Sequence, residues 1–293
     1  MRGRVVVTGA AGKLGRAVVR DLMEQGWDVL SVDRARPAGF RGELIAADLT
    51  DHAQVLEIFT GRVDEHPGPL DALVHLAAIP APGLVSNSAT FANNAVASWN
   101  VFNAARAAGI RNVVWASSES VLGLPFDETP PPYVPLDEEY RVRPESTYSL
   151  VKAIEEEMAH HLCRWDPLLK MIGLRFSNVM EPNDYEDFPS YDADPQLRKW
   201  NLWGYIDARD GAQAVRRALD HEATGLDVFI VANADTVMSR SSAELVAEVY
   251  PGVQIQRALG EHETLLCIDK ARRVLGFEPQ HSWRDHDGSR AAL

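Results

Sequence analysis

Cysteine is scarce in this chain, which has only two among its 293 residues, Cys163 and Cys267. Two cysteines cannot form the disulfide framework that holds small secreted domains together, so we expect reduced thiols in the core of a cytoplasmic protein. The first predicted strand begins almost at Met1, and no signal peptide is expected ahead of it.

Basic charge and long apolar runs are scarce as well. Lysine and arginine number 29 against 42 aspartate and glutamate residues, which gives a net charge of −13 at pH 7. This balance disfavours nucleic acid and anionic membranes as partners. No apolar run approaches the roughly 20 residues that a transmembrane helix needs. With 46% hydrophobic residues, the chain has enough apolar side chains for a large core, so it is expected to be soluble and globular.

The sequence also lacks a convincing set of metal ligands. His160 and His161 follow one another on a predicted helix, but no third ligand stands at a metal-binding spacing. Protein zinc sites use at least three side-chain ligands. We therefore interpret these histidines as surface residues and predict no metal.

What the sequence does contain begins with a strand and a glycine-rich turn. Residues 5–7 are an apolar run without polar alternation, which predicts a parallel strand buried on both faces. Gly9, Gly12 and Gly15 follow at intervals of three as a helical pattern begins. Glycine lets the backbone come close to a pyrophosphate, and the exposed N–H groups of a helix start attract the anion. The stretch predicts a nucleotide-phosphate site, with an ordinary glycine-rich turn as the alternative.

Asp33 supports the nucleotide interpretation. It ends a second predicted strand, residues 27–33, and stands 18 positions after Gly15 (33 − 15). A carboxylate near this spacing hydrogen-bonds the adenosine ribose in dinucleotide folds and would repel the 2′-phosphate of NADP. NAD is therefore the predicted cofactor, although the neighbouring Arg34 weakens this inference because arginine can accommodate a 2′-phosphate.

Strand and helix patterns alternate through the rest of the first half, which predicts an α/β protein with a doubly wound, Rossmann-type parallel sheet. In such a sheet, ligands bind at the carboxyl ends of the strands. The predicted strands cover residues 43–47, 70–76, 112–116, 170–174 and 226–231. The predicted helices cover residues 51–61, 88–108, 145–162 and 207–221, with short ones ending at 249 and 275 that Ser241-Ser242 and Asp269 are expected to cap.

We predict a division between a cofactor domain and a smaller C-terminal substrate lobe. Residues 1–175, with 202–232 returning to them, form the predicted NAD-binding domain, and residues 176–201 and 233–293 form the lobe. Two irregular stretches, 122–143 and 181–201, are expected to be loops over the site and facing the substrate.

Tyr148 and Lys152 are four residues apart on a predicted helix and so share a face. A nearby ammonium, together with a positively charged nicotinamide, would lower the pKa of the phenol. Such a tyrosine can take the proton of an alcohol as a hydride leaves its carbon. Ser118, at the end of a predicted strand, supplies a hydroxyl that can hold the reacting oxygen. A surface Tyr–Lys pair is the alternative.

Eight short motifs stand in order along the chain: Thr8-Gly-Ala-Ala-Gly-Lys-Leu-Gly15, Asp33, Asp48-Leu49, Leu76-Ala77-Ala78, Asn93-Asn94, Ser117-Ser118, Tyr148-Ser-Leu-Val-Lys152 and Arg175-Phe-Ser-Asn178. As a set they resemble an extended short-chain dehydrogenase/reductase of the NAD-dependent epimerase/dehydratase family. The resemblance covers nearly the whole chain and is weak on the substrate.

The resemblance implies a role for each motif. Tyr148 would be the acid/base, with Ser118 and Lys152 completing the catalytic set, and the two long helices 88–108 and 145–162 would pair in a homodimer. Substrate would contact Ser118, Glu119 and Asn178. The implied cofactor-binding residues are Gly9, Ala11, Gly12, Lys13, Leu14, Gly15, Asp33, Arg34, Asp48, Leu49, Leu76, Ala77, Ala78, Asn94, Ser117, Tyr148, Lys152 and Phe176.

The chain also departs from the family's pattern. Glu119-Ser120 stands where dehydratases place Asp-Glu, so the glutamate that abstracts a carbon-bound proton is missing and 4,6-dehydration is disfavoured. Val121-Leu122-Gly123 replaces Val-Tyr-Gly and changes the pocket wall. Trp200, Trp203 and Tyr205 are expected either to line a sugar pocket or to pack in the core.

The sequence therefore favours NAD-dependent hydride transfer at a secondary alcohol of a sugar or sugar acid. A dehydrogenase is slightly preferred, because the substrate lobe is small and residues 181–185 are similar to a segment of uronate dehydrogenases. A nucleotide-sugar (UDP-hexose) 4-epimerase is the alternative. A non-catalytic NAD(P)-binding regulator is a third possibility, but such proteins typically lose the Tyr–Lys pair.

Overall fold

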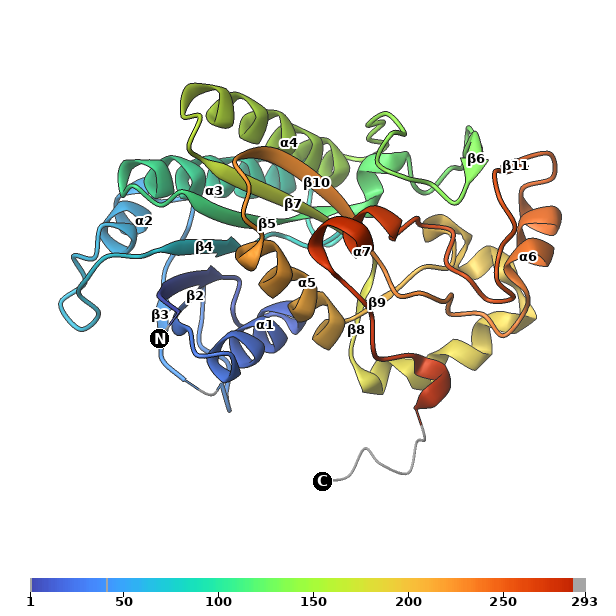
Figure 1. Cartoon of the computed structure of the whole chain (residues 1–293), viewed down its shortest axis with the longest axis horizontal. Coiled ribbons are helices and arrows are strands. Elements are labelled where there is room, and N and C mark those ends of the chain that lie inside the picture. The colour runs from blue at the N-terminus through green and yellow to red at the C-terminus, as the bar shows by residue number, and fades with distance from the viewer. Residues whose placement is uncertain (1, 41, 287–293) are drawn as a thin grey trace.

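A seven-stranded sheet forms the centre of the molecule in this computed structural model, which describes residues 2–40 and 42–286 (Figure 1). All neighbouring strands of the sheet are parallel. Their order is β10-β7-β5-β4-β1-β2-β3, so the sheet grows outward in both directions from the point between β1 and β4. The Rossmann-type prediction is confirmed. The strands are β1 (Arg4–Thr8), β2 (Asp28–Asp33), β3 (Leu44–Ala46), β4 (Ala72–His75), β5 (Asn112–Ser118), β7 (Lys170–Phe176) and β10 (Gly225–Val231).

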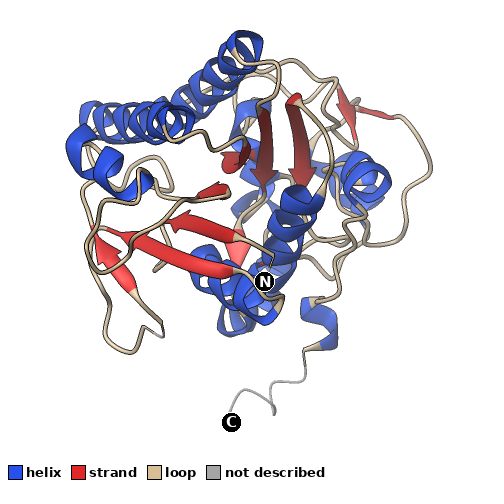
Figure 2. Ribbon diagram, turned by 60° about the vertical axis from the view of Figure 1, so that its left-hand side comes forward, coloured by secondary structure: helices blue, strands red, loops and turns tan. Residues whose placement is uncertain are grey.

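Helices cover both faces of this sheet (Figures 1 and 2). Helix α1 packs against α5 on one face, while α2, α3 and α4 pack together on the other. Within β1, Val5 and Val7 pack in the core shared with α1 and α5, and Val6 packs in the core shared with α2, α3 and α4. Both faces of the strand are therefore buried, which explains the unbroken apolar run. The helices are α1 (Lys13–Glu24), α2 (His52–Phe59), α3 (Asn87–Ala107), α4 (Thr147–Trp165) and α5 (Ala208–Asp220). Among the described residues, no helix combines the length and apolar character that crossing a membrane requires.

Two of the three helix caps predicted from the sequence are present. Asp51 caps α2 by accepting hydrogen bonds from the backbone of the first turn, and Ser241 caps α6 (Ser242–Val249) in the same way. Asp269 does not cap α7 (Asp269–Leu275), so that prediction is wrong. It is instead the first helical residue, where its negative charge still favours the positive helix start.

The remaining elements form a smaller group beside the sheet (Figure 1). Stretch 122–143 is not wholly irregular, because β6 (Tyr133–Val134) pairs with β11 (Gln254–Ile255). A strand of two residues is too short to leave a period in the sequence. The other elements are β8 (Val179–Met180), β9 (Ile206–Asp207) and the 3₁₀ helices η1 (Glu119–Leu122), η2 (Pro182–Ala193), η3 (Pro195–Leu197), η4 (Lys199–Asn201) and η5 (Trp283–Asp285).

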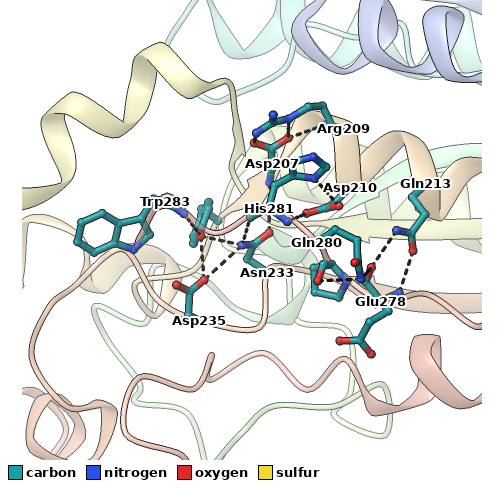
Figure 3. A network of polar contacts seen from close by, with 12 residues as sticks. Asp207, Arg209, Asp210, Gln213, Asn233, Asp235, Glu278, Gln280, His281 and Trp283 are labelled. Carbon is teal, nitrogen blue, oxygen red and sulfur yellow. Dashed lines mark hydrogen bonds and ion pairs between the residues drawn. The ribbon is translucent and has the colours of Figure 1, made fainter. Parts of the chain in front are cut away.

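A polar network holds the C-terminal segment onto α5 (Figure 3). The buried Tyr205 hydroxyl donates to Asp235 Oδ1 at 2.8 Å and accepts from Asn233 Nδ2 at 2.7 Å. His281 donates its backbone N–H to Asp210 of α5 at 2.8 Å. Trp203 and Tyr205 are fully buried, so they pack in the core and do not line a sugar pocket.

The glycine turn between β1 and α1 depends on two close backbone contacts. Gly9 has a φ of +72°, and a Cβ there would lie 2.6 Å from the backbone nitrogen of Ala77. A Cβ on Gly15 would lie 2.1 Å from the carbonyl oxygen of Gly9. Only glycine fits both positions, so the turn brings the start of α1 directly beside the ends of β1 and β4.

Gly15→Ala should lower the free energy of unfolding by roughly 2–3 kcal/mol, because the added methyl group forces α1 away from the turn. Gly12→Ala is the matched control, since its Cβ would meet Gly9 at 3.4 Å and its φ of −69° suits alanine. Urea unfolding followed by circular dichroism measures both. Equal unfolding midpoints for the two variants would show that the turn does not depend on this contact.

Candidate active site

One cavity of about 1190 Å³ lies at the carboxyl ends of β1, β2, β4, β5 and β7. Nearly all the site residues predicted from the sequence line it, although they come from segments far apart in the chain. Those residues are Gly9, Ala11, Gly12, Lys13, Leu14, Gly15, Asp33, Arg34, Asp48, Leu49, Leu76, Ala77, Ala78, Ser117, Ser118, Glu119, Tyr148, Lys152, Phe176 and Asn178.

Asn94 is the exception and lies behind the cavity wall. It is fully buried, accepts a hydrogen bond from the backbone N–H of Ile79 at 2.8 Å and donates to the Ile79 carbonyl at 3.0 Å. The side chain therefore fixes the loop after β4, whose residues 79–82 do line the cavity. The predicted cofactor contact of Asn94 is corrected to support of this loop.

Asp33 ties the glycine turn to the end of β2. Its carboxylate accepts the backbone N–H of Ala11 at 2.9 Å and that of Arg34 at 2.7 Å. The Arg34 guanidinium donates to Asn93 Oδ1 at 2.6 Å, so this cation already has a polar partner. Asp33 thus lines the cavity, as its predicted contact with the adenosine ribose requires.

The first turn of α1 forms one side of the cavity. Gly12 precedes the helix and provides no side-chain cap, so the first N–H groups of α1 remain available to an anion. Together with the close glycine contacts and the Asp33 carboxylate, this cradle fits a dinucleotide. Within the described residues, no group of three or more His, Cys, Asp or Glu residues is arranged to hold a metal ion.

Stretch 181–201 was expected to face the substrate, but only Trp200 of it lines the cavity. Asp184 pairs with Lys13 at 2.6 Å and Glu181 pairs with Arg16 at 2.8 Å, so these acids hold the start of α1. Tyr185 is buried and bonds to Asp207. The segment similar to uronate dehydrogenases is therefore structural here, and that similarity does not describe the pocket.

Tyr148, Ser118 and Lys152 meet at one end of the cavity. The Lys152 ammonium lies 6.0 Å from the centre of the Tyr148 ring. The Ser118 hydroxyl oxygen accepts two hydrogen bonds from Ser120, one from its backbone N–H at 3.2 Å and one from its hydroxyl at 2.9 Å. Since its oxygen is occupied as an acceptor, the Ser118 proton is free to point at Tyr148 or at the oxygen of a substrate.

Burial raises the pKa of the Tyr148 phenol, and Lys152 and Ser118 lower it without cancelling that effect. The predicted lowering includes a positively charged nicotinamide; for the chain alone the phenol pKa is raised, because the ring is buried and Glu155 and Glu119 add negative charge nearby. A positive charge bound in the cavity would shift the balance toward phenolate.

Glu119 adds a titratable group at the same end of the cavity. Burial raises its pKa to about 7, so the carboxyl is partly protonated near neutral pH. Asn201 donates to its Oε1 at 3.4 Å. The uncharged Ser120, Ser177 and Asn178 line the cavity with it, while the buried guanidinium of Arg198, which does not line the cavity, lies near Glu119 and opposes the rise in its pKa.

Two buried glutamates on α4 escaped the sequence analysis. Glu156 accepts from Ser117 at 2.6 Å and forms a two-point pair with Arg175 at 2.8 and 2.9 Å, while Glu155 pairs with Lys152. They stand three and four positions after Lys152, on the same helix face as Tyr148. That spacing could have indicated both ion pairs from the sequence, because an acid on a buried helix face requires a partner.

Comparisons with known proteins agree with this geometry. A family model described as the NAD dependent epimerase/dehydratase family matches residues 5–232. A UDP-glucose 4-epimerase from Rhizobium leguminosarum bv. trifolii is 27% identical over 94% of this chain and 93% of its own length. An L-arabinose 1-dehydrogenase (NAD(P)+) from Haloferax volcanii is 27% identical over 74% of this chain and 82% of its own length.

A solved structure extends the agreement to the fold. A short-chain dehydrogenase/reductase superfamily protein from Agrobacterium tumefaciens, solved with NAD bound, superposes with a TM-score of 0.71 and 25% identity over 96% of this chain and 94% of that one. The family match covers most of the sequence, and the cradle has the features that a dinucleotide needs. The chain therefore belongs to the NAD dependent epimerase/dehydratase family, and NAD is its cofactor.

Proposed function

We propose that this protein is an NAD-dependent dehydrogenase that oxidises a secondary alcohol of a small free sugar. The observation that carries the proposal is the meeting of Tyr148, Ser118 and Lys152 beside a cavity end lined by uncharged polar groups, Glu119 and Trp200. Hydroxyl, amide and carboxyl groups beside an aromatic ring suit a molecule that presents several hydroxyls. The alternatives are a sugar acid and a nucleotide sugar.

The residues divide the chemistry among them. The Ser118 hydroxyl donates to the alcohol oxygen and holds it, and the Tyr148 phenolate accepts the alcohol proton as general base. Lys152 keeps a positive charge beside the phenol and presents its remaining N–H to the cavity. NAD, when bound, supplies the hydride acceptor. Glu119 is available for a hydrogen bond with a second sugar hydroxyl.

The charges around the cavity favour a small sugar over a nucleotide sugar. Among the described lining residues, the basic side chains are Lys13, Arg34 and Lys152. Lys13 and Arg34 flank the cofactor cradle, and Lys152 pairs with Glu155. Arg198 lies near Glu119 and against the Trp200 ring, but it is buried and does not line the cavity. The substrate end thus presents no unpaired arginine or lysine to a diphosphate, which a nucleotide-sugar epimerase needs while its keto intermediate turns over.

An epimerase acting on a nucleotide sugar is the second candidate. It is supported by the similarity to the Rhizobium UDP-glucose 4-epimerase along nearly the full length of both chains. A non-catalytic regulator is disfavoured, because the chain keeps both Tyr148 and Lys152 and brings them into the cavity.

We further propose a homodimer through α3 and α4, which lie side by side on one face of the sheet (Figure 1). Phe91, Val96 and Trp99 on α3 and Leu150 on α4 are large apolar side chains that are each more than 40% exposed, as a helix pair that covers a partner would leave them in the monomer. Sedimentation velocity at micromolar concentration should give a dimer, and Trp99→Asp should shift it toward monomer. A wild-type chain that sediments as a monomer would overturn this proposal.

The reaction type is tested with a panel of free aldoses, uronates and UDP-sugars, each with NAD and with NADP. We expect NADH formation, followed by absorbance, from at least one free aldose and a lower rate with NADP. NMR of the same mixtures detects epimers. An epimer formed from a UDP-sugar, with no NADH released from any free sugar, would replace the dehydrogenase with the second candidate.

Tyr148→Phe should reduce turnover of the identified substrate by about 10²-fold or more, the scale expected for a positioned acid/base. NAD affinity, measured by calorimetry, should stay nearly unchanged because the ring is kept. Tyr140→Phe is the matched control, since this tyrosine does not line the cavity. Full activity in Tyr148→Phe would remove the tyrosine from the mechanism.

A further inference from the structure

The Lys152 ammonium is buried and paired within α4. Its Nζ donates to the Ala116 carbonyl at 2.8 Å and to Glu155 Oε2 at 2.9 Å, and the two side chains are 4% and 0% exposed. An ammonium without a counter-ion at this depth would lose its proton, because burial penalises the charged form. Glu155 therefore determines the state of Lys152 as well as its position.

The other oxygen of Glu155 ends a chain of hydrogen bonds from the sheet. Ser98 of α3 donates to Glu155 Oε1 at 2.7 Å, and Ser98 Oγ lies 3.1 Å from His75 Nε2. Thr8 Oγ1 lies 2.7 Å from His75 Nδ1. Burial lowers the pKa of His75 to about 3, so the ring is neutral and has one donor and one acceptor.

These contacts fix the direction of every bond in the chain. Ser98 uses its proton on Glu155, so His75 donates from Nε2 to Ser98 and accepts from Thr8 at Nδ1. Burial raises the pKa of Glu155, and the hydrogen bonds that its two oxygens accept from Lys152 and Ser98 oppose that rise and favour the ionised carboxylate. Thr8 is fully buried, so this series of hydrogen bonds has no outlet to solvent at its Thr8 end and does not serve as a proton path.

We propose that Glu155 is a positioning residue, the counter-ion that keeps Lys152 charged and directed at the cavity, and that Ser98, His75 and Thr8 hold it in place. The part of this proposal that concerns catalysis rests on the proposed function, since Lys152 acts there through Tyr148. The charge state of Lys152 does not depend on it.

The other charges near Lys152 do not replace Glu155. Burial would lower the pKa of Lys152, but Glu155, Tyr148 and Glu156 outweigh it and raise the pKa. Glu156 is already committed to Arg175 and Ser117. His75 is neutral, and Glu119 acts on Tyr148 from η1. Among the described charges around the ammonium, Glu155 is the carboxylate in direct contact with it.

The test is an NMR titration of the full chain labelled with ¹³C-lysine. The sequence has five lysines, so the Cε signals are few, and Lys152→Arg identifies the one from Lys152. In the wild type this signal should not titrate below pH 10. In Glu155→Gln its midpoint should fall by at least one pH unit, a tenfold change in the acid dissociation constant. A midpoint in Glu155→Gln equal to that of the wild type would overturn the proposal, as would a wild-type midpoint below pH 9.

Two further variants guard the result. Glu157→Gln removes an acid from the same helix, but Glu157 is 69% exposed and pairs with His161, so Lys152 should titrate as in the wild type. Ser98→Ala carries the test if Glu155→Gln does not fold. It removes one hydrogen bond that holds Glu155. The acid dissociation constant of Lys152 should therefore rise about threefold, which lowers its titration midpoint. An unchanged midpoint in Ser98→Ala would overturn the role of the hydrogen-bond chain.

A kinetic readout separates positioning from mere stability. On the identified substrate, kcat/KM of Glu155→Gln should fall at alkaline pH as Lys152 loses its proton, whereas a general loss of stability would lower it evenly at all pH values. If no substrate is oxidised, the proposed function fails while the titration still decides the role of Glu155.

Discussion

Burial of the parallel sheet on both faces is the constraint on which the rest of the molecule depends. Val5, Val6 and Val7 have no access to solvent on either side, and the neighbouring strands are similar. Polar side chains of the sheet can therefore reach solvent or a ligand only at the ends of the strands. At the carboxyl ends, the turn after β1, the last residue of β2 (Asp33) and the last residue of β5 (Ser118) converge on one cavity. The site thus follows from the packing of the core.

The same constraint explains why charged groups beneath the cavity occur in pairs. One pair, Glu156 with Arg175, connects α4 to the sheet. The other, Glu155 with Lys152, lies within α4, and each carboxylate also accepts a hydrogen bond from a serine. Removing one member would leave a buried charge without a partner, which costs more than the pair itself contributes. These pairs fix the catalytic helix in rotation and height, so Tyr148 reaches the cavity.

Periodicity and short motifs were enough to predict the sheet, its helices and the residues around the cavity. They failed where the outcome depended on contacts between distant segments. Asn94 has a motif position but faces Ile79, and residues 181–185 have a familiar sequence but contact α1. The raised pKa of Tyr148 depends on burial and on Glu119, which no local pattern reports. Spacing identifies a shared face, whereas partners and depth come only from the fold.

The parallel bridge between Leu136 and Leu266, two residues beyond β6, has a consequence for how the chain matures during synthesis. Leu136 donates its backbone N–H to Leu265 at 2.8 Å and accepts from Cys267 at 2.6 Å, so the segment that follows the cavity wall at Leu124 and Pro125 is held by chain made about 130 residues later (267 − 136 = 131). Contacts so distant in sequence form late. On the ribosome, the half that recognises the nucleotide can assemble early, while the wall beside the reacting group waits for the final fifth of the polypeptide.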